Sequence, residues 1–375
     1  MKNVYMMLLG AGLLTACQPA AKMDVSGMLN GIESDTLLVN HRPVGEGEAQ
    51  LDTVPMQNGQ FAFNVGDSVL KQVYIYAKPS GNGAISMQAL GLILLPGRPV
   101  TVSGTLEDYR LGGDAFYEAC NELNDQLRPC ILKLDSLREV CMQMEKDGIP
   151  SDSIRKAYTP SREFLDRMQD LRCDFIRSHA DQEVAVYALS RDLSMQRVGE
   201  MLDVVAEPVR TGVMAPLYRQ VKEGYDKEME RRAAAERVKE GNPAPDFTLK
   251  DLKGNDFTLS SLRGKYVVLD FWGSWCGWCI KGVPDMKKAY AKHKAKVEFV
   301  GIDCRDTEEK WRKAVAEHDM PWLHVRNEGK PDVSVLYAVR GYPTKIVLSP
   351  EGTILKIVVG EDPEFYSYLD ELLNS

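Results

Sequence analysis

Hydrophobic and polar residues alternate in short runs along residues 24–106 of the chain. A period of two places every second side chain on one face of a β-strand. The Asn58-Gly59 pair between two of these runs is typical of a two-residue hairpin turn. We therefore predict an antiparallel β-sandwich with strands at Thr36–Asn40, Gln50–Val54, Phe61–Val65, Gln72–Ala77, Leu92–Leu95 and Pro99–Ser103.

In residues 107–240 the hydrophobic residues recur at spacings of three and four, which is typical of amphipathic helices. The longest such patterns lie at Phe116–Met144, where Pro129 predicts a kink, and at Phe164–Ile176. The charged run Glu223–Glu240 predicts a solvated helix that connects this helical region to the rest of the chain.

Three cysteines, Cys120, Cys130 and Cys141, fall within the first helical pattern. At 1.5 Å per residue they lie about 15 Å or more apart, beyond the reach of a disulfide. A bridge would have to cross to another element, such as the one that carries Cys173. We favour unpaired cysteines in the core of this region.

The continuous apolar run Tyr266–Trp272 predicts a buried strand, and it is followed by Trp275-Cys276-Gly277-Trp278-Cys279. Residues i and i+3 of a helix lie about 5 to 6 Å apart, a distance that allows a disulfide to open and close. A thiol at a helix N-terminus has a lowered pKa because the helix dipole stabilises the thiolate. We therefore predict Cys276 as the nucleophile and Cys279 as the resolving thiol.

A CxxC motif can also belong to a zinc site, a haem-attachment site or a pair of structural cysteines. A structural zinc site needs four ligands, and the five histidines of the chain have no ligand spacing. Haem attachment needs a histidine after the second cysteine, where this chain has Ile280. A pair of buried structural cysteines remains as the alternative to a redox pair.

Several motifs in residues 241–375 together resemble a thioredoxin-fold domain of the TlpA/ResA-like type. Besides the CxxC segment, these motifs are Asp270-Phe271-Trp272, Pro284, Arg340–Thr344 ahead of the strand Lys345–Leu348, and the additional hairpin that begins at Gly241–Leu249. The resemblance implies an α/β thioredoxin fold and a thiol-disulfide oxidoreductase that needs no bound cofactor.

The resemblance also implies roles for residues outside the motif. Tyr342-Pro343 is expected to be cis, to pack against the cysteines and to present backbone to a substrate; an ordinary turn proline is the alternative. Asp270, in an apolar strand, is expected to have a raised pKa and to assist proton transfer for Cys279. The alternative is a strand-end aspartate that faces water.

The residues around the cysteines leave some questions open. Thioredoxin has Gly-Pro between its cysteines, whereas this chain has Gly277-Trp278, so the direction of electron flow is not determined. Trp275 and Trp278 are candidates for the surface that contacts a partner, or for packing residues. Asp306, near the place of a family glutamate, is interpreted as a solvated loop carboxylate, and Cys304 as a small buried hydrophobic residue.

The start of the chain indicates where this chemistry takes place. Lys2, the apolar stretch Val4–Leu14 and the sequence Leu14-Thr15-Ala16-Cys17 predict a signal peptide over residues 1–16 that ends in a lipobox. The resemblance implies acylation of Cys17, with residues 17–23 as a tether; an unlipidated signal peptide is the alternative.

We therefore predict a lipid-anchored thiol-disulfide oxidoreductase of the cell envelope that faces the periplasm and acts as a reductant of protein disulfides. The family suggests a membrane electron donor of the CcdA or DsbD type, and residues 24–106 resemble a β-domain that precedes thioredoxin domains in Bacteroidetes lipoproteins. Nucleic acid is not expected as a partner, because the net charge is −8 and no basic patch is present.

The alternatives to this function are a thiol peroxidase and a non-catalytic binding lipoprotein. The peroxidatic signature PxxxTxxC would require Pro and Thr where this chain has Leu269 and Gly273. A passive module would tolerate the loss of either cysteine.

Overall fold

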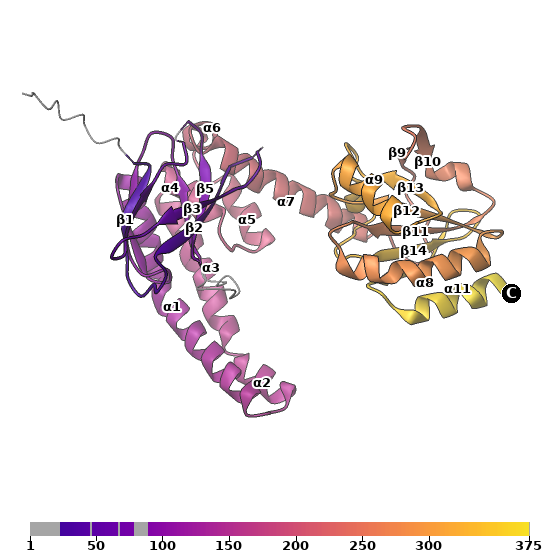
Figure 1. Cartoon of the computed structure of the whole chain (residues 1–375), viewed down its shortest axis with the longest axis horizontal. Coiled ribbons are helices and arrows are strands. Elements are labelled where there is room, and N and C mark those ends of the chain that lie inside the picture. The colour runs from indigo at the N-terminus through magenta and orange to yellow at the C-terminus, as the bar shows by residue number, and fades with distance from the viewer. Residues whose placement is uncertain (1–22, 46, 67, 79–88, 375) are drawn as a thin grey trace, which may run out of the picture. The chain divides into compact units, whose positions relative to one another are not determined.

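The computed structural model describes residues 23–45, 47–66, 68–78 and 89–374. The predicted signal peptide, Cys17 and most of the predicted tether lie outside these residues. The chain forms two compact units, Met1–Lys222 and Glu223–Ser375 (Figure 1). Among the described residues, no helix is both long and apolar enough to cross a membrane.

The N-terminal unit contains two four-stranded sheets, in the orders β4-β1-β7-β8 and β3-β2-β5-β6. All predicted strands are present, and the unit has two further strands, β1 and β8, that the sequence did not predict. Most neighbours are antiparallel as predicted, but β1 pairs with β7 in parallel, so the first sheet is mixed. The strands are β1 (Val25–Leu29), β2 (Thr36–Pro43), β3 (Gln50–Pro55), β4 (Gln60–Phe63), β5 (Lys71–Ala77), β6 (Leu90–Leu94), β7 (Val100–Gly104) and β8 (Tyr109–Gly112).

Helices follow the sheets, as the spacing of hydrophobic residues predicts. Asp114 caps the first helix by accepting a hydrogen bond from the backbone N–H of Phe116, and Pro129 lies inside that helix. Cys120, Cys130, Cys141 and Cys173 are all free. The helices are α1 (Ala115–Lys146), α2 (Ser151–Tyr158), α3 (Ser161–Ser178), α4 (Glu183–Leu189), α5 (Met195–Leu202), α6 (Glu207–Thr211) and α7 (Ala215–Ala235).

The C-terminal unit is built on a seven-stranded sheet in the order β10-β9-β13-β12-β11-β14-β15. The central strand β11 pairs in parallel with β12 and antiparallel with β14. The strands are β9 (Thr248–Asp251), β10 (Asp256–Thr258), β11 (Tyr266–Trp272), β12 (Val297–Asp303), β13 (Leu323–Arg326), β14 (Thr344–Leu348) and β15 (Ile354–Val359).

Four α-helices of this unit come after β11: α8 (Gly277–His293), α9 (Glu308–Glu317), α10 (Val333–Leu336) and α11 (Pro363–Asn374). Two hydrophobic clusters use residues of opposite parity on β11, as expected of a strand buried on both faces. One contains Val268 and Trp272 with residues of α8, α9 and α11, and the other contains Leu269 and Phe271.

The unit begins before residue 241, within the run that the sequence indicated as a solvated connecting helix. Ala234 and Val238 are buried, and Val238 belongs to a core cluster of the C-terminal unit. Glu228 forms an ion pair with Arg340 at 3.0 Å. The inner side of this segment is therefore packed: its few apolar residues face the domain, and the Glu228 side chain, 14% exposed, pairs with Arg340 there.

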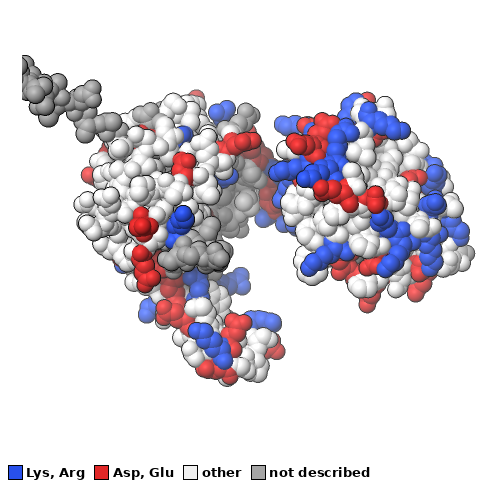
Figure 2. All heavy atoms as spheres, viewed as in Figure 1, with Lys and Arg blue, Asp and Glu red and all other residues white. Residues whose placement is uncertain are grey.

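Charged side chains of both signs are interspersed on the face of the C-terminal unit shown in Figure 2. The face of the N-terminal unit in the same view has larger areas without charged side chains.

Candidate functional site

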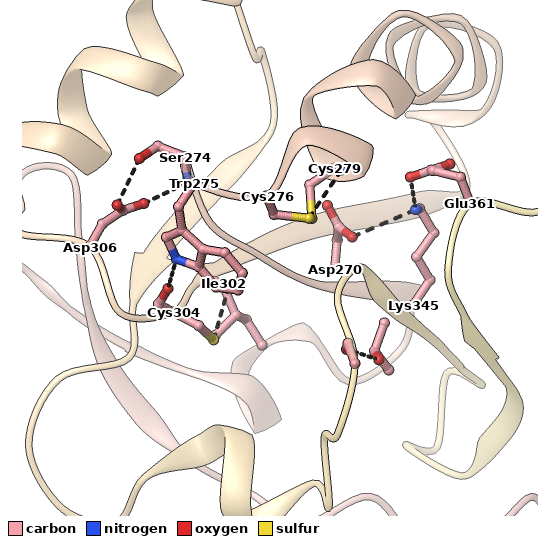
Figure 3. The surroundings of a disulfide bond; sticks show 12 residues. Asp270, Ser274, Trp275, Cys276, Cys279, Ile302, Cys304, Asp306, Lys345 and Glu361 are labelled. Carbon is pink, nitrogen blue, oxygen red and sulfur yellow. Dashed lines mark hydrogen bonds and ion pairs between the residues drawn. A yellow bond between two sulfur atoms is a disulfide. The ribbon is translucent and has the colours of Figure 1, made fainter. Parts of the chain in front are cut away.

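The cysteines lie where β11 passes into α8. Cys276 is the N-cap residue of the helix, and it forms a disulfide with Cys279 across a Cα–Cα distance of 5.2 Å (Figure 3). The backbone N–H of Cys279 donates a hydrogen bond to the Cys276 sulfur at 3.1 Å. The Cys276 sulfur thus receives an N–H of the first helical turn, the arrangement that stabilises a thiolate.

The two cysteines are equally buried: each residue is 6% exposed in the disulfide form. The neighbouring tryptophans are the exposed groups: Trp275 is 48% and Trp278 66% exposed. The Trp275 ring packs edge-on against Tyr342, with ring centres 5.1 Å apart.

The Tyr342-Pro343 bond is cis, as the resemblance implied. It lies directly before β14, the strand that pairs with β11. The Tyr342 side chain is half-buried and packs against both core clusters of the unit. The strand pairing therefore brings this segment to the end of β11 that carries the cysteines.

Asp270 is buried on β11, on the same face as Val268 and Trp272. Burial raises the pKa of its carboxyl group to about 6, against the opposing effect of the Lys345 ammonium group. The predicted rise in pKa is confirmed, and the alternative of a water-facing carboxylate is wrong. In Figure 3 the Asp270 carboxylate points toward the disulfide on one side and toward Lys345 on the other.

Asp270 belongs to a set of charged side chains with Lys345 and Glu361, two residues that the sequence did not indicate. The Lys345 Nζ lies 3.9 Å from an Asp270 oxygen and 2.5 Å from Glu361 Oε1. The Lys345 side chain is only 2% exposed. A lysine inside the apolar run Thr344–Leu348 was the available signal, since a buried ammonium group requires a carboxylate partner.

Gly282 on α8 provides the space for the Glu361 carboxylate. A Cβ atom at position 282 would lie 2.1 Å from Glu361 Oε1. An open cavity of about 540 Å³ beside this point is lined by residues of α8 and α11, with Trp278 and Tyr366 among them. Glu361 thus forms an ion pair with the buried Lys345 and also lines the open cavity beside Trp278.

A second pair of carboxyl groups, Asp303 and Asp306, lies at the end of β12. Asp306 accepts hydrogen bonds from the Ser274 backbone N–H at 2.6 Å and from the Ser274 hydroxyl at 2.7 Å. The interpretation of Asp306 as a solvated loop carboxylate is therefore wrong, because it fixes the loop that leads to Cys276. Burial and the Asp306 carboxylate raise the pKa of Asp303 to about 8.

Cys304 is a free, buried cysteine, in agreement with the interpretation of a small hydrophobic residue. Burial raises the pKa of its thiol to about 12. Its backbone carbonyl accepts a hydrogen bond from Trp275 Nε1 at 2.9 Å. Cys304 therefore contributes to the site by holding the Trp275 ring in place through its backbone carbonyl.

Comparisons with known proteins agree with this geometry. The model of the AhpC/TSA family matches residues 241–357. The chain is 33% identical over 130 residues to thiol-disulfide oxidoreductase ResA of Bacillus cereus, a match that covers 34% of this chain and 75% of the relative. It is 32% identical to ResA of Bacillus subtilis over 153 residues, which cover 40% of this chain and 84% of the relative.

A solved structure, the thioredoxin domain of a thiol-disulfide oxidoreductase from Bacteroides vulgatus, is 34% identical with a TM-score of 0.34. That match covers 36% of this chain and 99% of the solved chain. The residues that the family model matches include both cysteines. By its C-terminal domain, the chain belongs to the family of ResA-type thiol-disulfide oxidoreductases.

Proposed function

We propose that the protein reduces disulfides of protein substrates through Cys276 and Cys279. The observation that carries this proposal is the Cys276–Cys279 disulfide at the N-terminus of α8, where a backbone N–H points at the Cys276 sulfur. The same N–H groups and helix dipole favour a thiolate on Cys276 once the pair is reduced.

In the proposed reaction, the Cys276 thiolate attacks one sulfur of the substrate disulfide and releases the other as a thiolate, which takes up a proton. Cys279 then loses its proton and attacks the Cys276 sulfur of the mixed disulfide. This second step releases the remaining substrate thiol and forms the Cys276–Cys279 disulfide. The substrate gains two electrons and the enzyme dithiol loses them.

Asp270 is the proposed acceptor of the Cys279 proton. A pKa of about 6 keeps this carboxyl group mostly ionised at neutral pH while leaving it more basic than an exposed aspartate. The assignment is supported by the burial of Asp270 on the strand face that packs against the hydrophobic cluster containing Cys276 and Cys279. We propose Lys345 and Glu361 as positioning residues, because the Lys345 ammonium group lies beside the Asp270 carboxylate and Glu361 forms an ion pair with Lys345.

The proposed contact surface for the substrate consists of Trp275, Trp278, Tyr342 and Pro343. The two tryptophans are exposed beside the cysteines, and an exposed aromatic residue offers apolar area that a partner can cover. Trp278 also lies next to the cavity between α8 and α11.

The proposed location is the cell envelope, with the protein anchored through lipid on Cys17 and facing the periplasm. The support comes from the lipobox at Leu14–Cys17. A membrane electron donor of the CcdA or DsbD type would then reduce the disulfide after each turnover, which the exchange chemistry requires.

Trapping of substrate tests the assigned order of the two cysteines. Cys279→Ser removes the resolving thiol, so mixed disulfides between Cys276 and substrate proteins should accumulate on non-reducing gels and disappear with dithiothreitol. Cys141→Ser is the matched control, because this free, partly buried cysteine belongs to α1 of the N-terminal unit and should leave turnover unchanged. Adducts on Cys276→Ser instead would reverse the roles, and no adducts in either variant would favour a passive module.

A thiol peroxidase is the second candidate, since the matching family model covers the same residues. Leu269 and Gly273 occupy the positions at which the peroxidatic signature has Pro and Thr. We therefore expect no peroxide consumption above that of the Cys276→Ser variant.

A further inference from the structure

The N-terminal unit contains a polar hollow that plays no part in the proposed thiol chemistry. It has a volume of about 380 Å³ and is lined by residues of β5, α1, α3 and α4, with Arg172, Arg191, Asp192 and several tyrosines among them. This volume lies in the range of small-molecule sites.

Arg172 is a buried cation without adequate compensation. The residue is 7% exposed, and its Nε has no hydrogen-bond partner among the described residues. Its ion pair is with Asp192 at 3.5 Å, and the Asp192 side chain is 89% exposed. Water screens so exposed a carboxylate, so it offsets little of the cost of burying a guanidinium group.

Arg191 adds a second guanidinium group to the same hollow. Its Nε is also buried without a hydrogen-bond partner among the described residues. The guanidinium carbon lies 4.8 Å from the centre of the Tyr187 ring, a cation–π contact. No carboxylate in the part of the chain that the structure describes forms an ion pair with Arg191. The hollow thus holds two positive charges and one exposed negative charge.

Tyrosines supply the rest of the wall. Tyr74, Tyr109 and Tyr187 line the hollow, and the Tyr109 hydroxyl donates to the Gly91 carbonyl at 3.0 Å. Burial raises the pKa of Tyr109 and of Tyr187, so both hydroxyl groups stay neutral at pH 7. Neutral phenols add no negative charge, and their rings offer flat apolar faces.

We propose that this hollow binds a small molecule that carries a carboxylate or phosphate group, which Arg172 and Arg191 hold while the tyrosine rings pack against its uncharged part. A bidentate oxyanion satisfies unpaired guanidinium N–H groups and neutralises the excess charge. The unit that precedes the redox domain would then be a ligand-binding module.

Isothermal titration calorimetry of the full chain tests the proposal at constant ionic strength. The probes are inorganic phosphate, phenyl phosphate and benzoate, so that the two oxyanions are distinguished and the contribution of a ring is measured. We expect at least one probe to bind in the micromolar to millimolar range. Arg191→Gln should weaken that binding about tenfold or more, since a charge-assisted hydrogen bond is lost.

Arg167→Gln is the matched control, because Arg167 is an exposed arginine of the same helix α3 as Arg172. It should bind the probes as the wild type does. Arg172→Gln should also lose binding while its circular dichroism spectrum stays unchanged; if this variant does not fold, the half-buried Arg191 still decides the test. Absence of binding of all three probes, or equal binding by Arg191→Gln, would overturn the proposal.

Discussion

Lys345 in the C-terminal unit and Arg172 in the N-terminal unit are both buried cations, yet their surroundings differ. The Lys345 side chain is 2% exposed and lies between the carboxylates of Asp270 and Glu361. The Arg172 side chain is 8% exposed and has only the exposed Asp192 carboxylate. The charge of Lys345 is compensated within the protein, whereas that of Arg172 leaves an excess of positive charge that a ligand can neutralise.

This difference predicts a large loss of stability when Lys345 is replaced by methionine and a small change when Arg172 is. Lys345→Met should lower the free energy of unfolding of the C-terminal unit by about 3 to 5 kcal/mol, because two buried carboxylates lose their partner. Urea unfolding followed by tryptophan fluorescence measures this unit alone, since all five tryptophans lie in it. Lys356→Met, at a side chain 45% exposed on β15, is the control and should change little. Equal losses in both variants would mean that Lys345 is not the compensating charge.

Asp270→Asn should act in the other direction, and its effect should depend on pH. The folded-state pKa of about 6 lies above the ordinary value of 3.8, so ionisation of Asp270 costs stability as the pH rises through this window. The variant should therefore be more stable than wild type by about 1 to 3 kcal/mol at pH 8. Below pH 4 the two proteins should unfold at the same urea concentration.

Turnover of the same variant sharpens the assignment of Asp270 as a proton acceptor. The rate of insulin reduction by wild type should rise with pH through about 6, where the carboxyl group ionises. Asp270→Asn should be slower by about 100-fold near neutral pH and lack this rise, because general base catalysis typically contributes that much. If Asp270→Asn is more stable than wild type and fully active, the Asp270 carboxylate lowers stability and takes no part in proton transfer.

Arg172→Met should produce the smallest change in stability. The substitution removes a buried charge that has little compensation, so the free energy of unfolding of the N-terminal unit should stay within about 1 kcal/mol of wild type. Far-UV circular dichroism during urea unfolding reports the helices and strands of both units. The N-terminal unit contains no tryptophan, so its transition is the part of the dichroism change that tryptophan fluorescence does not share. A loss as large as that of Lys345→Met would mean that Arg172 is compensated within the fold.

The sequence predicts the local features of this molecule well. The strand Tyr266–Trp272, the helix after it, the burial of Asp270 and the free cysteines of α1 depend on patterns a few residues long. The missed features depend on residues brought together by the fold. Lys345 and Glu361 meet because β14 and β15 form a hairpin, and Asp306 reaches Ser274 because β11 and β12 end side by side.

The parallel pair in the first sheet of the N-terminal unit was also missed because it depends on how the fold brings distant strands together. Strand β1 pairs with β4 and with β7, which follow it at different distances along the chain. The alternation that predicts the other strands does not identify β1, and alternation carries no information on the direction of a neighbouring strand.

The space at Gly282 also has an evolutionary consequence. Any larger residue at position 282 would meet the Glu361 carboxylate, whose oxygen lies 2.1 Å from the place of its Cβ atom. Positions 282 and 361 should therefore not vary independently among descendants of this chain. A side chain at position 282 requires the flexible Glu361 side chain to move or to be replaced, and Lys345 would then lose its 2.5 Å ion pair with Glu361.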